Sequence, residues 1–124
     1  QIAATVGGAA IDVTNAGGSN NRVHKTQTKF TIPAGGGSYR IHAWVEFDAN
    51  TTGYRELKIA TDASGTTVIA RTRVEAVQGG YATCIPVTAG NDFVGGSYFQ
   101  VWAEQLSGGA LDISACGIMI EKLG

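Results

Sequence analysis

The chain has 124 residues, and its length, composition and charge exclude several classes of protein. Hydrophobic residues make up 44%, so a packed core is attainable and intrinsic disorder is disfavoured. Charged residues make up 15% and the net charge is −1, which gives no basic field for holding phosphates. We therefore expect one domain that binds no nucleic acid. No apolar stretch approaches the ~20 residues of a spanning helix, so we expect no membrane insertion.

Glycine clusters divide the chain into short segments rich in strand-forming residues. The 18 glycines occur mostly as pairs or triplets, which mark turns because glycine permits a positive φ and weakens helices. Segments spaced at roughly ten residues between such turns predict an all-β sandwich or barrel. The expected strands cover residues 2–6, 10–14, 22–32, 38–48, 54–61, 66–76, 81–88, 97–106 and 111–121.

Alternating polar and apolar residues predict which side of a strand is buried. In residues 38–48 the side expected to face the core carries Tyr39, Ile41, Ala43, Val45 and Phe47. Residues 111–121 are almost wholly apolar, as a strand covered on both faces would be. Pro33 and Pro86 are expected at strand ends, where a missing N–H is harmless.

The cysteines and histidines are too few to suggest a cross-linked or metal-binding protein. Cys84 and Cys116 each lie in an apolar run, where we expect two buried, free thiols. His24 and His42 have no partner at ligand spacing, so no zinc site is predicted. A Gly-x-Ser-x-Gly motif is missing, and the glycine triplet opens into a strand rather than a phosphate-binding helix. We expect no enzyme, no metal and no cofactor.

The stretch Asp48-Ala-Asn50-Thr-Thr52-Gly53 has two interpretations. Oxygen-bearing side chains at alternate positions before a glycine resemble the first half of a calcium loop. Position 12 of such a loop would be Ile59 rather than a glutamate, and flanking helices are not predicted. We favour a turn that connects two strands.

Several turn motifs follow one another in a defined order along residues 22–124. They are Phe30-Thr-Ile-Pro-Ala-Gly with Gly37-Ser-Tyr39-Arg-Ile41, then Ala49-Asn50-Thr-Thr-Gly53-Tyr54-Arg55, Val87-Thr-Ala-Gly90-Asn-Asp92-Phe93, Ser107-Gly108-Gly109-Ala110-Leu111 and Ile118-Met-Ile-Glu-Lys-Leu123-Gly124. In this order they resemble the tumour-necrosis-factor/C1q-like (TNF/C1q-like) jelly rolls, and the turn at Asn50 resembles that of the bacteriophage members. The sequence departs from the pattern of this family at two places. Asn91 shifts its turn by one residue, and the glycine pair 95–96 predicts a bulge or an extra loop.

The resemblance implies a ten-strand, two-sheet antiparallel jelly-roll sandwich that assembles as a three-fold homotrimer. Residues 22–124 would form the jelly roll, and residues 1–21 an N-terminal arm with the first strands of the same domain. It also implies that Cys84 and Cys116 lie in one sheet, on either side of the 38–48 strand. That separation is too large for a disulfide, which needs Cα atoms within about 7 Å.

Trp44 and Trp102 lie on the polar-looking sides of their strands, which leaves three alternatives open. Each could be covered by a loop or by the N-terminal segment, form a subunit contact, or stack on a sugar. Tryptophan is enriched at the centres of interfaces, and the resemblance puts the strand of Trp44 nearest the three-fold axis. We predict trimer contacts at His42, Trp44 and Trp102. The predicted surface-loop contacts are Asn50, Tyr54, Arg55, Asp62, Asn91 and Asp92.

Two functional hypotheses follow from this sequence. The first is a structural virion protein, a trimeric jelly roll attached to a phage capsid as a decoration protein or head-fibre module. Its partners would be itself and capsid or other virion proteins, on the surface of a particle assembled in the bacterial cytoplasm. The alternative is a receptor- or glycan-binding head domain of a longer phage tail fibre. The sequence has no coiled-coil or collagen repeat for a stalk, which favours the first hypothesis. Gln1 in place of Met indicates a processed chain or a piece of a longer one.

Overall fold

The computed structural model describes residues 13–15, 22–26, 29–108, 111 and 113–123. Every regular element within these ranges is a β-strand. The nine strands are β1 (Val13–Asn15), β2 (Arg22–Thr26), β3 (Phe30–Thr31), β4 (Gly37–Phe47), β5 (Tyr54–Ala60), β6 (Val68–Glu75), β7 (Thr83–Phe93), β8 (Tyr98–Gln105) and β9 (Ile113–Leu123). The predicted strand at 2–6 lies outside the described residues, and the predicted strand at 22–32 is seen as β2 and β3.

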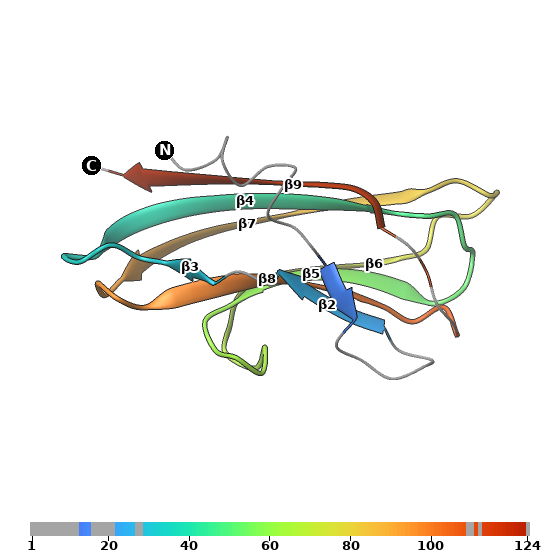
Figure 1. The fold of residues 1–124 in the computed structure, drawn as a ribbon. Helices are drawn as coiled ribbons and strands as arrows, with labels where there is room; N and C mark the ends of the chain where they lie inside the picture. Colours follow the sequence, from blue (N-terminus) through green and yellow to red (C-terminus); the bar gives the residue numbers. More distant parts are fainter. Residues whose placement is uncertain (1–12, 16–21, 27–28, 109–110, 112, 124) are drawn as a thin grey trace.

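The strands form two antiparallel sheets stacked face to face (Figure 1). The larger sheet has the order β1-β2-β8-β5-β6, with β3 also pairing with β8, and the smaller has the order β7-β4-β9. From β3 to β9 the chain crosses between the sheets at every step except the β5–β6 hairpin. This connectivity is jelly-roll-like, and the predicted all-β, two-sheet antiparallel sandwich is confirmed.

The core lies between the two sheets and follows the alternation read from the sequence. The side of β4 predicted to face inward is buried along its whole length, and each of its residues is at most 3% exposed: Tyr39, Ile41, Ala43, Val45 and Phe47. Leu57 and Ile59 of β5 meet them from the other sheet, with Phe99 and Val101 of β8. Removing these side chains from water is the main force that holds the sheets together.

Two expectations about individual strands are wrong. Pro86 lies inside β7 rather than at a strand end. A proline is tolerated there because β7 is an edge strand among the described strands, so an outward-facing N–H needs no partner. Strand β9 is not covered on both faces, since Met119 is 47% exposed on the outer side of the sandwich.

The two ends of the sandwich carry different connections, and the register of β4 fixes which. Its first residues pair with the last residues of β7 and β9, so loops 32–36 and 94–97 lie at the C-terminal end of β9. Its last residues pair with the first residues of β7 and β9, so connections 48–53, 76–82 and 106–108 lie at the opposite end (Figure 1). The β5–β6 connection 61–67 does not, because Ala60 at the end of β5 pairs with Gln100 near the start of β8. We refer to that end as the distal end, formed by connections 48–53, 76–82 and 106–108.

Candidate functional site

The outer side of the three-stranded sheet presents an exposed tryptophan at its centre. Trp44 is 37% exposed and lies in register between Pro86 of β7 and Gly117 of β9. A Cβ atom on Gly117 would lie 2.4 Å from the indole Nε1 of Trp44, so the ring rests against the bare backbone of β9. Met119 is exposed on the same side. We refer to this surface, formed by Trp44, Pro86, Ala115, Gly117 and Met119, as the Trp44 face.

Hydrogen-bonding and charged residues next to the Trp44 face are paired with each other. The Nδ1 atom of His42 lies 2.8 Å from the hydroxyl of Thr88. Farther along β4, Arg40 Nη1 lies 3.6 Å from Glu121 Oε1. Both pairs are exposed, so they contribute little to stability. An apolar centre with a polar rim is the usual composition of a protein–protein interface.

The three predicted trimer contacts are not brought together. His42 and Trp44 share the outer side of the small sheet, whereas Trp102 lies on the outer side of the large sheet. Trp102 is only 5% exposed because the 61–67 connection lies over it. A Cβ atom on Gly65 would lie 3.0 Å from its ring, so glycine permits this approach. The structure therefore agrees with the alternative in which a loop covers Trp102, and little of this side chain remains for a subunit contact.

Arg55 was predicted as a surface-loop contact, but its side chain is fully buried, at 0% exposure. Its Nη1 donates hydrogen bonds of 2.9 Å to the carbonyls of Thr52 and Tyr54, and its Nη2 donates one of 2.8 Å to Asn50. Burial lowers the pKa of this guanidinium. Arg55 therefore orders the β4–β5 connection from inside and is not available to a partner.

The predicted contacts Asn50, in this connection, and Tyr54, at the start of β5, also have internal roles. Asn50 Oδ1 accepts the N–H of Thr52 at 2.9 Å, which is the strand-connecting turn that the sequence favoured. The hydroxyl of Tyr54 donates to Glu104 Oε1 at 2.5 Å. This hydrogen bond and partial burial raise the pKa of Tyr54. Arg73 lies over its ring, 4.1 Å from the centroid.

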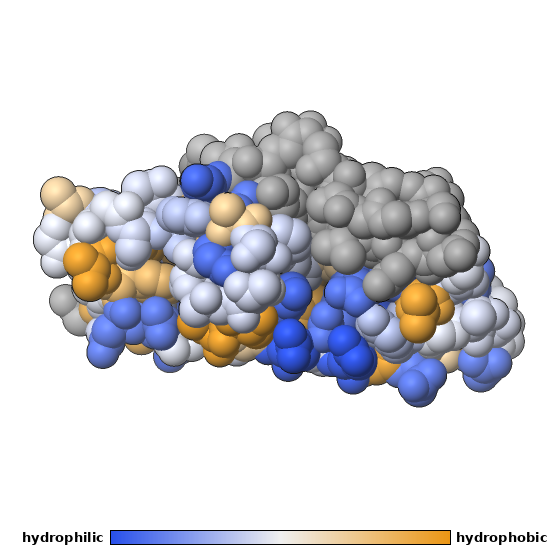
Figure 2. All heavy atoms as spheres, turned by 90° about the horizontal axis from the view of Figure 1, so that it is seen from below, coloured by the Kyte–Doolittle hydropathy of each residue, from blue (hydrophilic) through white to orange (hydrophobic). Residues whose placement is uncertain are grey.

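The outer side of the large sheet holds a buried carboxylate that the sequence did not single out. Glu56 is 1% exposed and receives Arg71 Nε at 2.7 Å and Arg73 Nη2 at 3.2 Å. It lies directly opposite Glu104 of β8, and the two arginines offset the repulsion between like charges on neighbouring strands. In the view of this side, hydrophilic residues are interspersed with separate hydrophobic ones (Figure 2). We interpret this cluster as structural.

Asp62 lies in the β5–β6 connection, where its carboxylate serves the loop itself. It accepts the backbone N–H groups of Thr66 at 2.8 Å and Thr67 at 3.0 Å, and the hydroxyls of Ser64 and Thr66. These hydrogen bonds hold the pKa of Asp62 well below its usual range. The ionised carboxylate therefore stabilises the loop at neutral pH.

Asn91 and Asp92 were predicted in a loop, but both lie in β7. The pairing of β7 with β4 continues without a shift to Phe93, so Asn91 causes no displacement of a turn. Asp92 accepts a short hydrogen bond from the hydroxyl of Ser38 on β4. The connection to β8 is instead a turn at 94–97, closed by the bond from Ser97 N to Val94 O at 3.1 Å.

Sequence reasoning missed the exposed apolar side chains of the distal end. Tyr81 is 69% exposed, Val77 39% and Leu106 40%. They follow glycines or strand ends in stretches without alternation, so no pattern marked them. The available signal was an aromatic residue directly after the Gly79-Gly80 pair, because a large side chain in a turn is poorly covered by its own chain.

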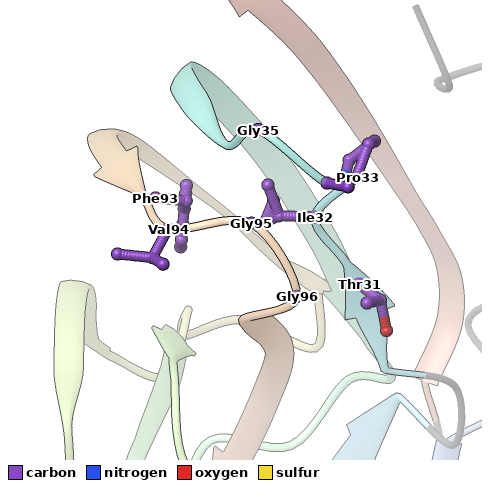
Figure 3. A pocket seen from close by; sticks show the side chains of 9 residues that line it. Thr31, Ile32, Pro33, Gly35, Phe93, Val94, Gly95 and Gly96 are labelled. Carbon is purple, nitrogen blue, oxygen red and sulfur yellow. The ribbon is translucent and has the colours of Figure 1, made fainter.

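The opposite end of the sandwich holds an open groove of about 960 Å³. It lies between the 32–36 and 94–97 loops, and Figure 3 shows Ile32, Phe93 and Val94 along its walls. Among the residues that line it, Thr31 alone carries a polar side-chain group. This lining contains no titratable side chain for general acid–base chemistry.

The cysteines are free, as expected, but they are not both buried. Cys84 is exposed on β7, since it alternates with the buried Thr83 and Ile85. Cys116 on β9 is half-buried against the core, and burial raises the pKa of its thiol. They flank β4 on opposite sides, as the resemblance implied.

In the described ranges no group of three or more His, Cys, Asp or Glu side chains is placed to hold a metal ion. The same part of the chain contains no helix of the length and apolar character needed to cross a membrane.

Comparison with known proteins gives distant likenesses of fold. No protein-family profile and no curated protein matches the chain. A CBM6 carbohydrate-binding module of lichenase 5A from Cellvibrio mixtus, in complex with cellotriose, is 23% identical, with a TM-score of 0.45; the match covers 98% of this chain and 95% of the module. The C-terminal CBM6 of LamC from Zobellia galactanivorans is 20% identical, with a TM-score of 0.46, and the match covers 94% and 95% of the two chains. The arabinose-bound MgGH51 α-L-arabinofuranosidase is 10% identical, with a TM-score of 0.47, over 86% of this chain and 18% of the enzyme.

Proposed function

We propose that this chain is a structural protein of a virion surface, a homotrimeric jelly roll whose subunits meet through the Trp44 face. It would attach to a phage capsid as a decoration protein or head-fibre module. The observation that carries the proposal is Trp44, an exposed indole at the centre of the outer sheet side, whose neighbours on β4 are hydrogen-bonded: His42 to Thr88 and Glu46 to Ser114. The motif order along residues 22–124 and the jelly-roll-like connectivity support the TNF/C1q-like assignment of the phage type.

The contribution of Trp44 to self-association follows from its exposure. About 37% of a side chain of roughly 250 Å² leaves about 90 Å² to bury in a contact. At ~25 cal/mol per Å² this is about 2 kcal/mol, or about 30-fold in the association constant.

The test is sedimentation equilibrium at micromolar concentration. We expect trimers of the unchanged chain and weaker association of Trp44→Ala and of Met119→Ser, the second of which removes little intrachain packing. Val94→Ala is the matched control, because Val94 is an exposed apolar residue of the 94–97 loop, outside the Trp44 face. A monomeric chain, or variants that associate as well as the unchanged chain, would refute self-association through this face. Immunogold labelling of intact phage particles tests the virion location, and unlabelled particles would refute it.

The alternative is a receptor- or glycan-binding head domain of a longer tail fibre. The specific observation in its favour is the exposed Tyr81 at the distal end. The coding sequence upstream of Gln1 separates the two functions, since a fibre head requires a long preceding shaft.

A further inference from the structure

We propose that the distal end is a binding surface for a neutral glycan, with the ring of Tyr81 as the platform on which a sugar stacks. The inference does not depend on self-association through the Trp44 face, and it gives the alternative function a definite site. Figure 1 shows that this end is opposite the C-terminal end of β9.

The conformation of Tyr81 suits stacking. Gly79 has a φ of +88°, and a Cβ atom on it would lie 3.2 Å from the tyrosine ring. The ring therefore rests along the bare turn on one side. Since 69% of Tyr81 is exposed, its other side is open to a ligand. Aromatic residues with a few polar groups around them are typical of small-ligand sites.

The connections that surround Tyr81 are held in place before any ligand binds. Gln78 Nε2 donates to the carbonyl of Thr51 at 2.9 Å, which ties connection 76–82 to connection 48–53. The N–H of Ala76 donates to Gly53 at 3.0 Å. Arg55 holds two further carbonyls of the 48–53 connection, those of Asn50 and Thr52, and the carbonyl of Tyr54 at the start of β5. A fixed surface loses less entropy on binding, which matters for a weakly binding ligand.

The remaining chemistry of this surface favours a ligand without charge. Thr51 and Thr52 are exposed and carry hydroxyls, and Gln78 keeps its Oε1 as an acceptor. Two exposed charged residues lie at the start of these connections, and both are acidic. Asp48 begins connection 48–53, and Glu75 directly precedes connection 76–82. They would repel sulfated, sialylated or uronic sugars, whereas neutral sugar hydroxyls are compatible with them.

The apolar part of the distal end has the size of a sugar rather than of a protein. Val77 and Leu106 are each about two-fifths exposed, at 39% and 40%, and with Tyr81 they offer three apolar side chains. A stable protein interface buries about 800 Å² on each partner. Three side chains can instead contact the C–H faces of one or two sugar rings.

The experiment is an array of neutral oligosaccharides, built from glucose, galactose and N-acetylglucosamine, together with sialylated, sulfated and uronate-containing ones. The strongest ligand is then titrated by calorimetry. We expect binding to a neutral oligosaccharide that is at least about tenfold weaker in Tyr81→Ala and nearly unchanged in Tyr81→Phe. Trp44→Ala is the second control, because it alters self-association and leaves this surface intact.

Several results would overturn the proposal: no binding to any neutral oligosaccharide, binding to acidic ones only, or equal affinity of the unchanged chain and Tyr81→Ala. Loss of binding in Trp44→Ala but not in Tyr81→Ala would place the sugar on the Trp44 face and also overturn it. Sedimentation of the same samples reports self-association separately, so failure of the glycan site and failure of the trimer are distinguishable.

Discussion

The substitution Gly53→Ala should destabilise the protein far more than its size suggests. Gly53 has a φ of +72°, and an added Cβ atom would lie 1.5 Å from the carbonyl oxygen of Leu106. An L-residue in this conformation costs about 1–2 kcal/mol. The backbone must also shift, which weakens the bonds from Ala76 N to Gly53 O and from Leu106 N to Tyr54 O, at about 1 kcal/mol each. The sum is about 3–4 kcal/mol.

Gly80→Ala is the matched control for this prediction. Gly80 has a φ of +80°, but nothing lies within 4 Å of an added Cβ, so only the conformational cost remains. Urea denaturation of both variants gives the two free energies of unfolding. The slope m of this free energy against urea concentration should be the same in both, which checks that unfolding is two-state. We expect Gly53→Ala to be the less stable by about 2 kcal/mol. Equal destabilisation of the two variants would show that the close approach to Leu106 is not a constraint.

Two further predictions concern titratable groups. Asp62→Asn should cost stability above about pH 4, and the difference should shrink as the pH falls below that, because the pKa of Asp62 is lowered only in the folded chain. Thermal unfolding between pH 7 and pH 2 measures this, and a difference independent of pH would contradict it. Cys84 should react with Ellman's reagent at least about tenfold faster than Cys116, which is half-buried with a raised pKa. Equal rates in the two single Cys→Ser variants would contradict the burial described here.

Much of the fold could be predicted because the alternation of polar and apolar residues along a strand indicates which side is buried. In β4 the alternate residues from Tyr39 to Phe47, which the sequence predicts to face the core, are the buried ones. The limits were set by pairing partners that a single segment does not show. Strand β7 continues through Asn91 and Asp92 because β4 is also 11 residues long and offers a pairing partner at every position.

The candidate site was harder to predict because exposure depends on loops that fold over strands. Trp44 and Trp102 have the same pattern of neighbours in the sequence, yet one is exposed and the other is covered by a loop whose glycine, Gly65, fits against its ring. No periodicity encodes that contact. The two tryptophans could be distinguished only after the 61–67 connection was placed.

Arg55 shows most clearly why a charged residue in a turn need not be a contact residue. An arginine after a glycine turn is usually exposed, since a buried charge is costly without partners. Here the turn itself supplies the partners, because the carbonyls of Asn50, Thr52 and Tyr54 all accept from one guanidinium. The charge is thus used to make a rigid connection. The most exposed large apolar side chain at this end is instead that of Tyr81, which was not among the predicted surface-loop contacts.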